Sequence, residues 1–154
     1  MLALTLQQIM HVTGLPDQTV RHWRSTLPPL QGRNGYTACF TPSDALALLV
    51  LKQLVRGMGI AVAGLRDVSE QLFAVCRGTA WPQLADKALA IDVVQGEVRL
   101  WGPEDEIDAP VILLPMRPLA EQLQAAWADT HPSFEQLSLI PPALVTTGGR
   151  RAAR

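Results

Sequence analysis

The chain has 154 residues, enough for one ordinary domain or two small ones. A hydrophobic fraction of 48% and a charged fraction of 18% exclude wholesale disorder and allow a packed core. The longest wholly apolar run, Ala45 to Leu51, is far shorter than the ~20 residues of a membrane helix, and no secretory signal is visible. Two cysteines are too few for a disulfide scaffold, so we expect a cytoplasmic protein with reduced thiols.

The net charge of −1 conceals an uneven distribution along the chain. Residues 1–78 hold seven Lys/Arg and four Asp/Glu, whereas residues 79–154 hold six and ten. An excess of positive charge favours contact with anions, so the first part is the better candidate for an anion-facing surface. The acidic second part indicates a different role.

Two short helices are predicted at the start. The run Thr5-Leu6-Gln7-Gln8 is a capping box, and Gly14 stands at a plausible helix end. A second helix begins at Pro16 or Asp17, carries Val20, Trp23 and Leu27 on its apolar side, and ends at Pro28-Pro29. Two short helices joined around one glycine are the helix-turn-helix pattern.

The next segment predicts a hairpin and two further helices. Asn34-Gly35 is a tight-turn signal, and the strand-like residues 36–40 after it suggest a small hairpin or wing. Thr41-Pro42-Ser43-Asp44 caps a helix that is apolar nearly all round from 45 to 56, as expected at the centre of a core. Residues 60–76 predict another helix.

The pattern changes after Gly78. Residues 88–101 alternate around Gln95-Gly96 as a β-hairpin does, and residues 111–114 suggest a short strand. A helix follows from Pro118. We therefore expect an α+β protein with a winged helix-turn-helix domain over 1–78, a small α/β dimerisation or partner-binding region over 79–135, and a flexible tail over 136–154.

An ordered series of landmarks runs through residues 4–66, and each spacing follows the order of elements given above. The series comprises Thr13-Gly14, Thr19-Val20-Arg21-His22-Trp23, Leu27-Pro28-Pro29, Arg33-Asn34-Gly35-Tyr36, Phe40-Thr41-Pro42-Ser43-Asp44, Leu54-Val55-Arg56-Gly57-Met58-Gly59-Ile60 and Leu65. In these landmarks the chain resembles the winged helix-turn-helix domain of MerR-like regulators. The resemblance covers about two-fifths of the sequence.

The resemblance implies that a recognition helix enters the DNA major groove while a wing grips the adjacent backbone. Early positions of that helix would reach base edges, and the planar guanidinium of Arg21 suits a guanine or a phosphate. The DNA-contacting residues implied in this way are Gln18, Thr19, Arg21, His22, Arg24, Arg33 and Tyr36.

Other roles for the same residues are also weighed. Trp23 shares a face with Val20 and Leu27, which favours a place in the core over a base contact. His11 and His131 have no partners at metal-ligand or triad spacing, and no cysteine follows Cys76 to complete a thiolate site. We therefore expect no metal, no cofactor and no catalytic centre.

The function expected is sequence-specific transcriptional regulation by a homodimer bound to an inverted repeat in double-stranded DNA. Leu119, Leu123 and Trp127, or an edge strand at 111–114, would make the dimer contact, although the same stripe could simply cover the local sheet. One alternative is a phage-type recognition or assembly factor, either excisionase-like or a DNA-packaging subunit. Another is an antitoxin-like or adaptor module that binds protein through residues 79–135 rather than DNA.

Overall fold

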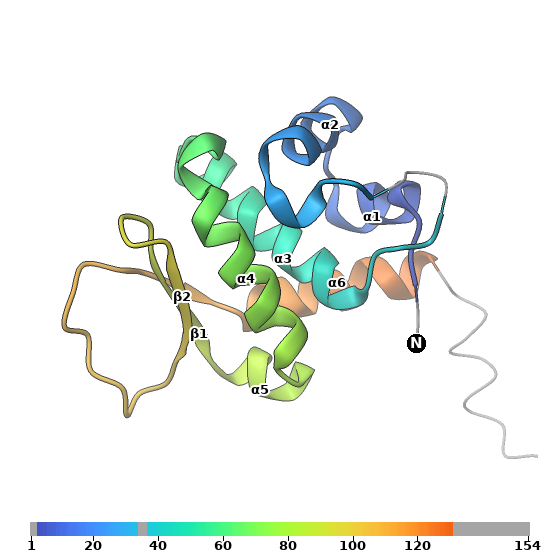
Figure 1. Ribbon diagram of the computed structural model, residues 1–154. Helices are drawn as coiled ribbons and strands as arrows, with labels where there is room; N and C mark the ends of the chain where they lie inside the picture. The colour runs from blue at the N-terminus through green and yellow to red at the C-terminus, as the bar shows by residue number, and fades with distance from the viewer. Residues whose placement is uncertain (1–2, 34–36, 131–154) are drawn as a thin grey trace, which may run out of the picture.

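The computed structural model describes residues 3–33 and 37–130 (Figure 1). Its elements confirm the predicted α+β class, with helices making up most of the described chain. The helices are α1 (Leu6–Thr13), α2 (Asp17–Thr26), α3 (Pro42–Lys52), α4 (Arg66–Gly78), α5 (Trp81–Asp86) and α6 (Arg117–Thr130), and the strands are β1 (Ala88–Asp92), β2 (Glu97–Trp101) and β3 (Ile112–Pro115).

Helices α1 and α2 begin and end where the sequence signals place them. The Thr5 hydroxyl accepts from the Gln8 backbone N–H and the Gln8 side chain accepts from the Thr5 N–H, which completes the predicted capping box. Gly14 has a φ of 66°, the left-handed conformation that only glycine adopts at little cost. A short turn then leads directly into α2.

Helix α3 is the centre of the core, as its composition predicts. Every side chain from Ala45 to Leu51 is buried, and α1, α4 and α6 all pack against this helix. The Thr41 hydroxyl and the Asp44 carboxylate form a second capping box at its start. A π-helical turn over Gln53–Gly57 extends it before Gly59 turns the chain with a φ of 71°.

Two predictions for the first 78 residues are wrong. Residues 37–40 form no hairpin strand, because Phe40 is buried and makes an isolated bridge with Leu4 ahead of α1. Residues 60–76 are not one helix, since a 3₁₀ turn over Val62–Leu65 precedes α4. The tip of the predicted wing, including Tyr36, lies outside the described residues, as does the predicted tail over 136–154.

The three strands form an antiparallel sheet in the order β2-β1-β3. The predicted hairpin around Gln95-Gly96 is confirmed, with Ile91 paired to Val98 in register. Ile91 and Val98 are buried, and β2 packs on α4. In Figure 1 the sheet lies at the opposite end of the molecule from α1 and α2.

Helix α6 joins the two predicted parts of the chain. It packs against α1, α3 and α5, and a single hydrophobic cluster runs from Leu4 to Leu123. The boundary predicted at residue 78 therefore does not separate two cores. No helix among the described residues has the length and apolar character to cross a membrane.

The dimer contact predicted on α6 is wrong for two of its three residues. Leu119 and Leu123 are buried inside their own chain, because the stripe that they form packs on α1 and α3. Trp127 is partly buried at the edge of the same core. An amphipathic stripe specifies that a helix face will be buried, and here the burying surface is intramolecular.

Candidate nucleic-acid interface

Helix α2 divides sharply into a core face and a solvent face. Val20 and Trp23 point into the core and are 3% and 1% exposed, which confirms the structural role predicted for Trp23. The opposite face is exposed at the helical spacing of i, i+3, i+4 and i+7 and carries Gln18, Arg21, His22 and Ser25. A polar helix face anchored by a buried tryptophan is rigid enough to present side chains to a partner.

Arg21 is the most prominent cation on this face. Its guanidinium lies 2.8 Å from the Asp17 carboxylate one turn earlier, and the two side chains are 74% and 50% exposed. Such an exposed pair contributes only about 0.2–1 kcal/mol. An incoming phosphate or base edge can therefore displace Asp17 at small cost, so Arg21 remains available to an anionic ligand.

The first turn of α2 meets the end of α3. The Arg56 guanidinium donates to the Thr19 hydroxyl at 3.2 Å, so Thr19 is partly buried rather than presented to solvent. Pro16 occupies the N-cap of α2 and provides no side-chain cap for the backbone N–H groups that follow. Of the residues predicted to read bases, Gln18 is therefore the more accessible.

Arg24 and Arg33, both predicted to contact DNA, make extensive contacts within the chain. The Arg24 guanidinium donates to the Arg33 backbone oxygen, and Arg33 Nη1 lies 2.8 Å from the Asp44 carboxylate. The Arg33 guanidinium also stacks 5.1 Å from the centre of the Phe40 ring, and its side chain is only 17% exposed. Arg33 thus stabilises the fold by pairing with Asp44 and packing on Phe40, a role that the sequence did not indicate.

Asp44 is the centre of this arrangement. Its carboxylate is 1% exposed and also accepts from Arg77 at 2.7–2.8 Å and from the Thr41 backbone N–H at 2.9 Å. A buried carboxylate requires such compensation, because removal from water is costly for a charged group. Asp44 therefore ties the segment after α2 to the start of α3 and the end of α4.

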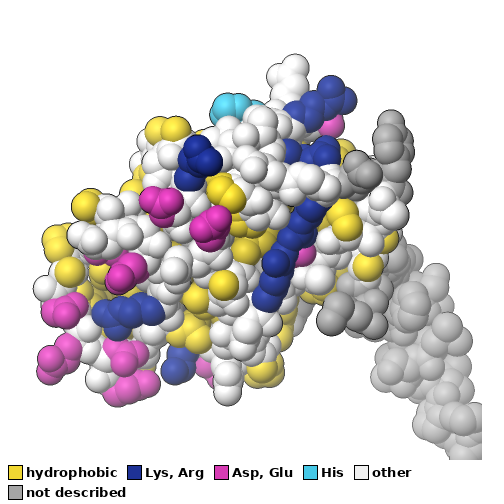
Figure 2. Space-filling view, in the orientation of Figure 1, with side chains coloured by type: hydrophobic (Ala, Val, Ile, Leu, Met, Phe, Trp, Pro, Cys, Tyr) yellow, Lys and Arg dark blue, Asp and Glu magenta, His cyan; other side chains and the backbone are white. Residues whose placement is uncertain are grey.

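The distribution of charge agrees with the order seen in the sequence. On the face drawn in Figure 2, Lys and Arg side chains lie mainly over the helical part, and Asp and Glu side chains are most frequent over the end formed by the strands and their loops, where some cations also lie. The acidic end includes Asp92, Glu97 and Asp108, which line a shallow depression with Arg99. An anionic ligand is accordingly favoured at the helical end.

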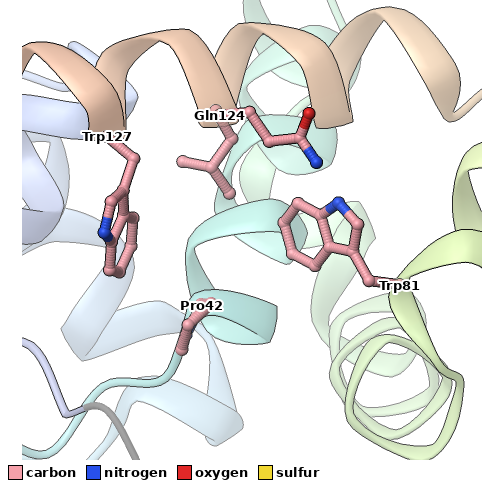
Figure 3. Close-up of a pocket in the computed structure, with 5 residues that line it drawn as sticks. Pro42, Trp81, Gln124 and Trp127 are labelled. Carbon is pink, nitrogen blue, oxygen red and sulfur yellow. The ribbon is translucent and has the colours of Figure 1, made fainter. Parts of the chain in front are cut away.

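A groove of about 280 Å³ lies between α3, α5 and α6 (Figure 3). Trp81 and Trp127 form its walls, and the Trp81 indole nitrogen is buried without a hydrogen-bond partner among the described residues. The Gln124 amide faces that nitrogen, and half a turn of the amide would present its oxygen to the indole N–H. The described residues that line the groove are uncharged, and their composition is that of a core edge.

Two observations bear on metal binding and thiol reactivity in the described part of the chain. No group of three or more His, Cys, Asp or Glu side chains there can hold a metal ion. Burial, and to a lesser degree the nearby Asp44 carboxylate, raises the pKa of the Cys76 thiol to about 12. Cys76 therefore stays protonated at neutral pH and is a poor nucleophile.

Sequence reasoning missed three contributors to this surface: Ser25, Lys52 and Arg56. Ser25 completes the exposed face of α2, and a helical projection of residues 17–26 is enough to find it. Lys52 ends α3 and Arg56 lies in the π-helical turn that follows it, and only the tertiary packing brings them beside α1 and α2.

No protein-family model, curated protein or solved structure matches the chain at a significant level.

Proposed function

We propose that the protein binds double-stranded DNA through α2, acting as a sequence-specific transcriptional regulator of the MerR-like helix-turn-helix type. The observation that carries the proposal is the exposed face of α2, where Gln18, Arg21 and His22 stand together on a helix anchored by a buried Trp23. In a helix-turn-helix protein the corresponding face lies in the major groove. Gln18 and Arg21 would reach base edges or phosphates, and His22 would contact the backbone.

A single copy of this face offers few contacts, so we propose that two copies bind an inverted repeat. Of the two dimer contacts that the sequence suggests, the stripe on α6 is disfavoured, because Leu119 and Leu123 are buried within the chain. The outer edge of β3 is the better candidate, since β3 is an edge strand of the sheet.

In vitro selection of random duplex DNA by the purified protein at near-physiological salt tests the proposal. Arg21→Ala should lose the enriched sequence, with a cost of about 1–3 kcal/mol in binding to it. Arg99→Ala removes the same charge from the acidic end and is the matched control. An enriched inverted repeat retained by the control and lost by Arg21→Ala supports a dimeric sequence reader. A protein that folds but enriches no sequence would contradict the proposal.

As a second candidate function, the protein would bind DNA without sequence preference and would also bind another protein, as in a phage-type assembly factor. The acidic end of the molecule favours it, because Asp92, Glu97 and Asp108 form a surface suited to a basic protein partner. Binding with steep salt dependence but no enriched sequence is the result expected of this alternative.

A further inference from the structure

A second polar depression lies beside α1 and α2, where the end of α3 meets α6. Its volume is about 170 Å³, several times the ~30 Å³ that one water occupies in the liquid. Among the described residues, its lining comprises two cations and two amides but no carboxylate: Lys52, Gln53, Arg56 and Gln122, with Leu49, Gly57 and Leu119. We call this depression the α3–α6 pocket.

The two cations of the α3–α6 pocket form no ion pair with any carboxylate in the described part of the chain. Lys52 donates to the backbone oxygen of Thr13 at 2.9 Å, and Arg56 donates to the Thr19 hydroxyl at 3.2 Å. Among the ion pairs of the described residues, neither cation is within 4.0 Å of an acidic group. These contacts hold both side chains in place while leaving their charges to be neutralised by something else.

Further hydrogen-bond donors surround the same space. The Gln53 amide folds over Gly57, where a Cβ atom would come within 2.5 Å of its nitrogen, so this close approach requires the glycine. Gln122 reaches the pocket from α6. An ammonium, a guanidinium and two amides that face one small space are suited to the oxygens of a phosphate-type anion.

We propose that the α3–α6 pocket binds a phosphodiester group of the DNA backbone. The inference rests on the proposed function, because Arg56 touches the first turn of α2 through Thr19 and so lies beside the helix that would enter the major groove. A phosphate held there would fix the depth and direction of α2 on the duplex without reading sequence. Arg56 and Lys52 are thus positioning residues for the bases read by Gln18 and Arg21.

Salt dependence of DNA binding provides the test. The duplex enriched by selection is titrated with the wild type, Arg56→Gln and Arg99→Gln between 50 and 200 mM salt. Each phosphate neutralised contributes about −0.9 to the slope of log K against log salt concentration. Between 50 and 200 mM salt, the wild type should therefore lose about 3.5-fold more affinity than Arg56→Gln loses. Arg99→Gln removes a charge at the acidic end, so its loss of affinity should equal that of the wild type.

Two additional variants make the outcome specific. Arg56→Lys keeps the charge, so its salt dependence should be nearly as steep as that of the wild type. Lys52→Gln should make the salt dependence less steep, as Arg56→Gln does. Arg56 is exposed and its removal leaves the core intact, so circular dichroism should report an unchanged fold. An unchanged slope in Arg56→Gln and Lys52→Gln, with wild-type binding intact, would overturn the pocket alone. Absence of DNA binding by the wild type would overturn both the pocket and the proposed function.

Discussion

Replacing Asp44 by alanine removes the carboxylate that three parts of the fold share. The group is 1% exposed, lies 2.8 Å from Arg33 and 2.7 Å from Arg77, and accepts from the Thr41 backbone N–H. Removal of one partner from a buried ion pair costs about 3–5 kcal/mol, because the remaining charge is left without compensation. Here the remaining charge is chiefly Arg33, since Arg77 is 44% exposed and can be rehydrated.

This loss is large beside the 5–15 kcal/mol by which typical domains are stable. We expect Asp44→Ala to lower the free energy of unfolding by about 3 kcal/mol or more, and the Tm by roughly 10 °C. Asp86→Ala is the matched control, because it deletes the same side chain from an ion pair whose members are 62% and 70% exposed. Its cost should stay below about 1 kcal/mol.

Urea unfolding followed by tryptophan fluorescence measures both variants. Asp44→Asn keeps the shape and an acceptor oxygen, so its free energy of unfolding should fall between that of the wild type and Asp44→Ala. If Asp44→Ala lowers the free energy of unfolding by no more than Asp86→Ala, the ion pairs around Asp44 do not stabilise the fold as proposed.

Three further outcomes are expected. Leu123→Ala should lower the free energy of unfolding by about 2–5 kcal/mol, and the unfolding midpoint should not depend on protein concentration. A midpoint that rises with concentration in the wild type but not in the variant would show instead that Leu123 lies in a dimer interface. Trp23→Ala should cost about 3–5 kcal/mol, so loss of DNA binding without loss of stability would show that Trp23 contacts DNA instead. The raised pKa of Cys76 predicts slow alkylation of its thiol at pH 8. Because the folded state holds this proton more tightly, the contribution of Cys76 to stability is complete below pH ~9 and falls as pH rises towards about 12. Cys76→Ala should not show this loss of stability at high pH.

Local signals in the sequence predicted the elements well where one residue type decides the conformation. The capping boxes at Thr5 and Thr41 and the glycine turn at Gly14 are determined by neighbours within four residues, so they can be recognised without the fold. The all-apolar stretch of α3 likewise predicts its central place, since such a helix has no face suited to water.

Long-range partners could not be predicted in the same way. Arg33 has the sequence context of a loop cation, and only the fold places it on Asp44, eleven residues away. The α6 stripe indicates that Leu119 and Leu123 are buried but not by which surface, so the pattern fits a dimer contact and an intramolecular contact equally well. The strand-like composition before Phe40 suggests a hairpin strand, but the segment forms only an isolated bridge between Phe40 and Leu4. In each case the local sequence pattern fits more than one arrangement, and tertiary packing determines which of them forms.

We propose above all that DNA lies on the exposed face of α2. Amide chemical-shift mapping of the isotope-labelled protein, titrated with a generic duplex of about 20 base pairs at low salt, tests this claim without knowledge of the preferred sequence. We expect the largest shifts in α2 around Arg21 and in the π-helical turn after α3 around Arg56, with the strands unaffected. Shifts concentrated in β1–β3, or none at all in a folded sample, would contradict it.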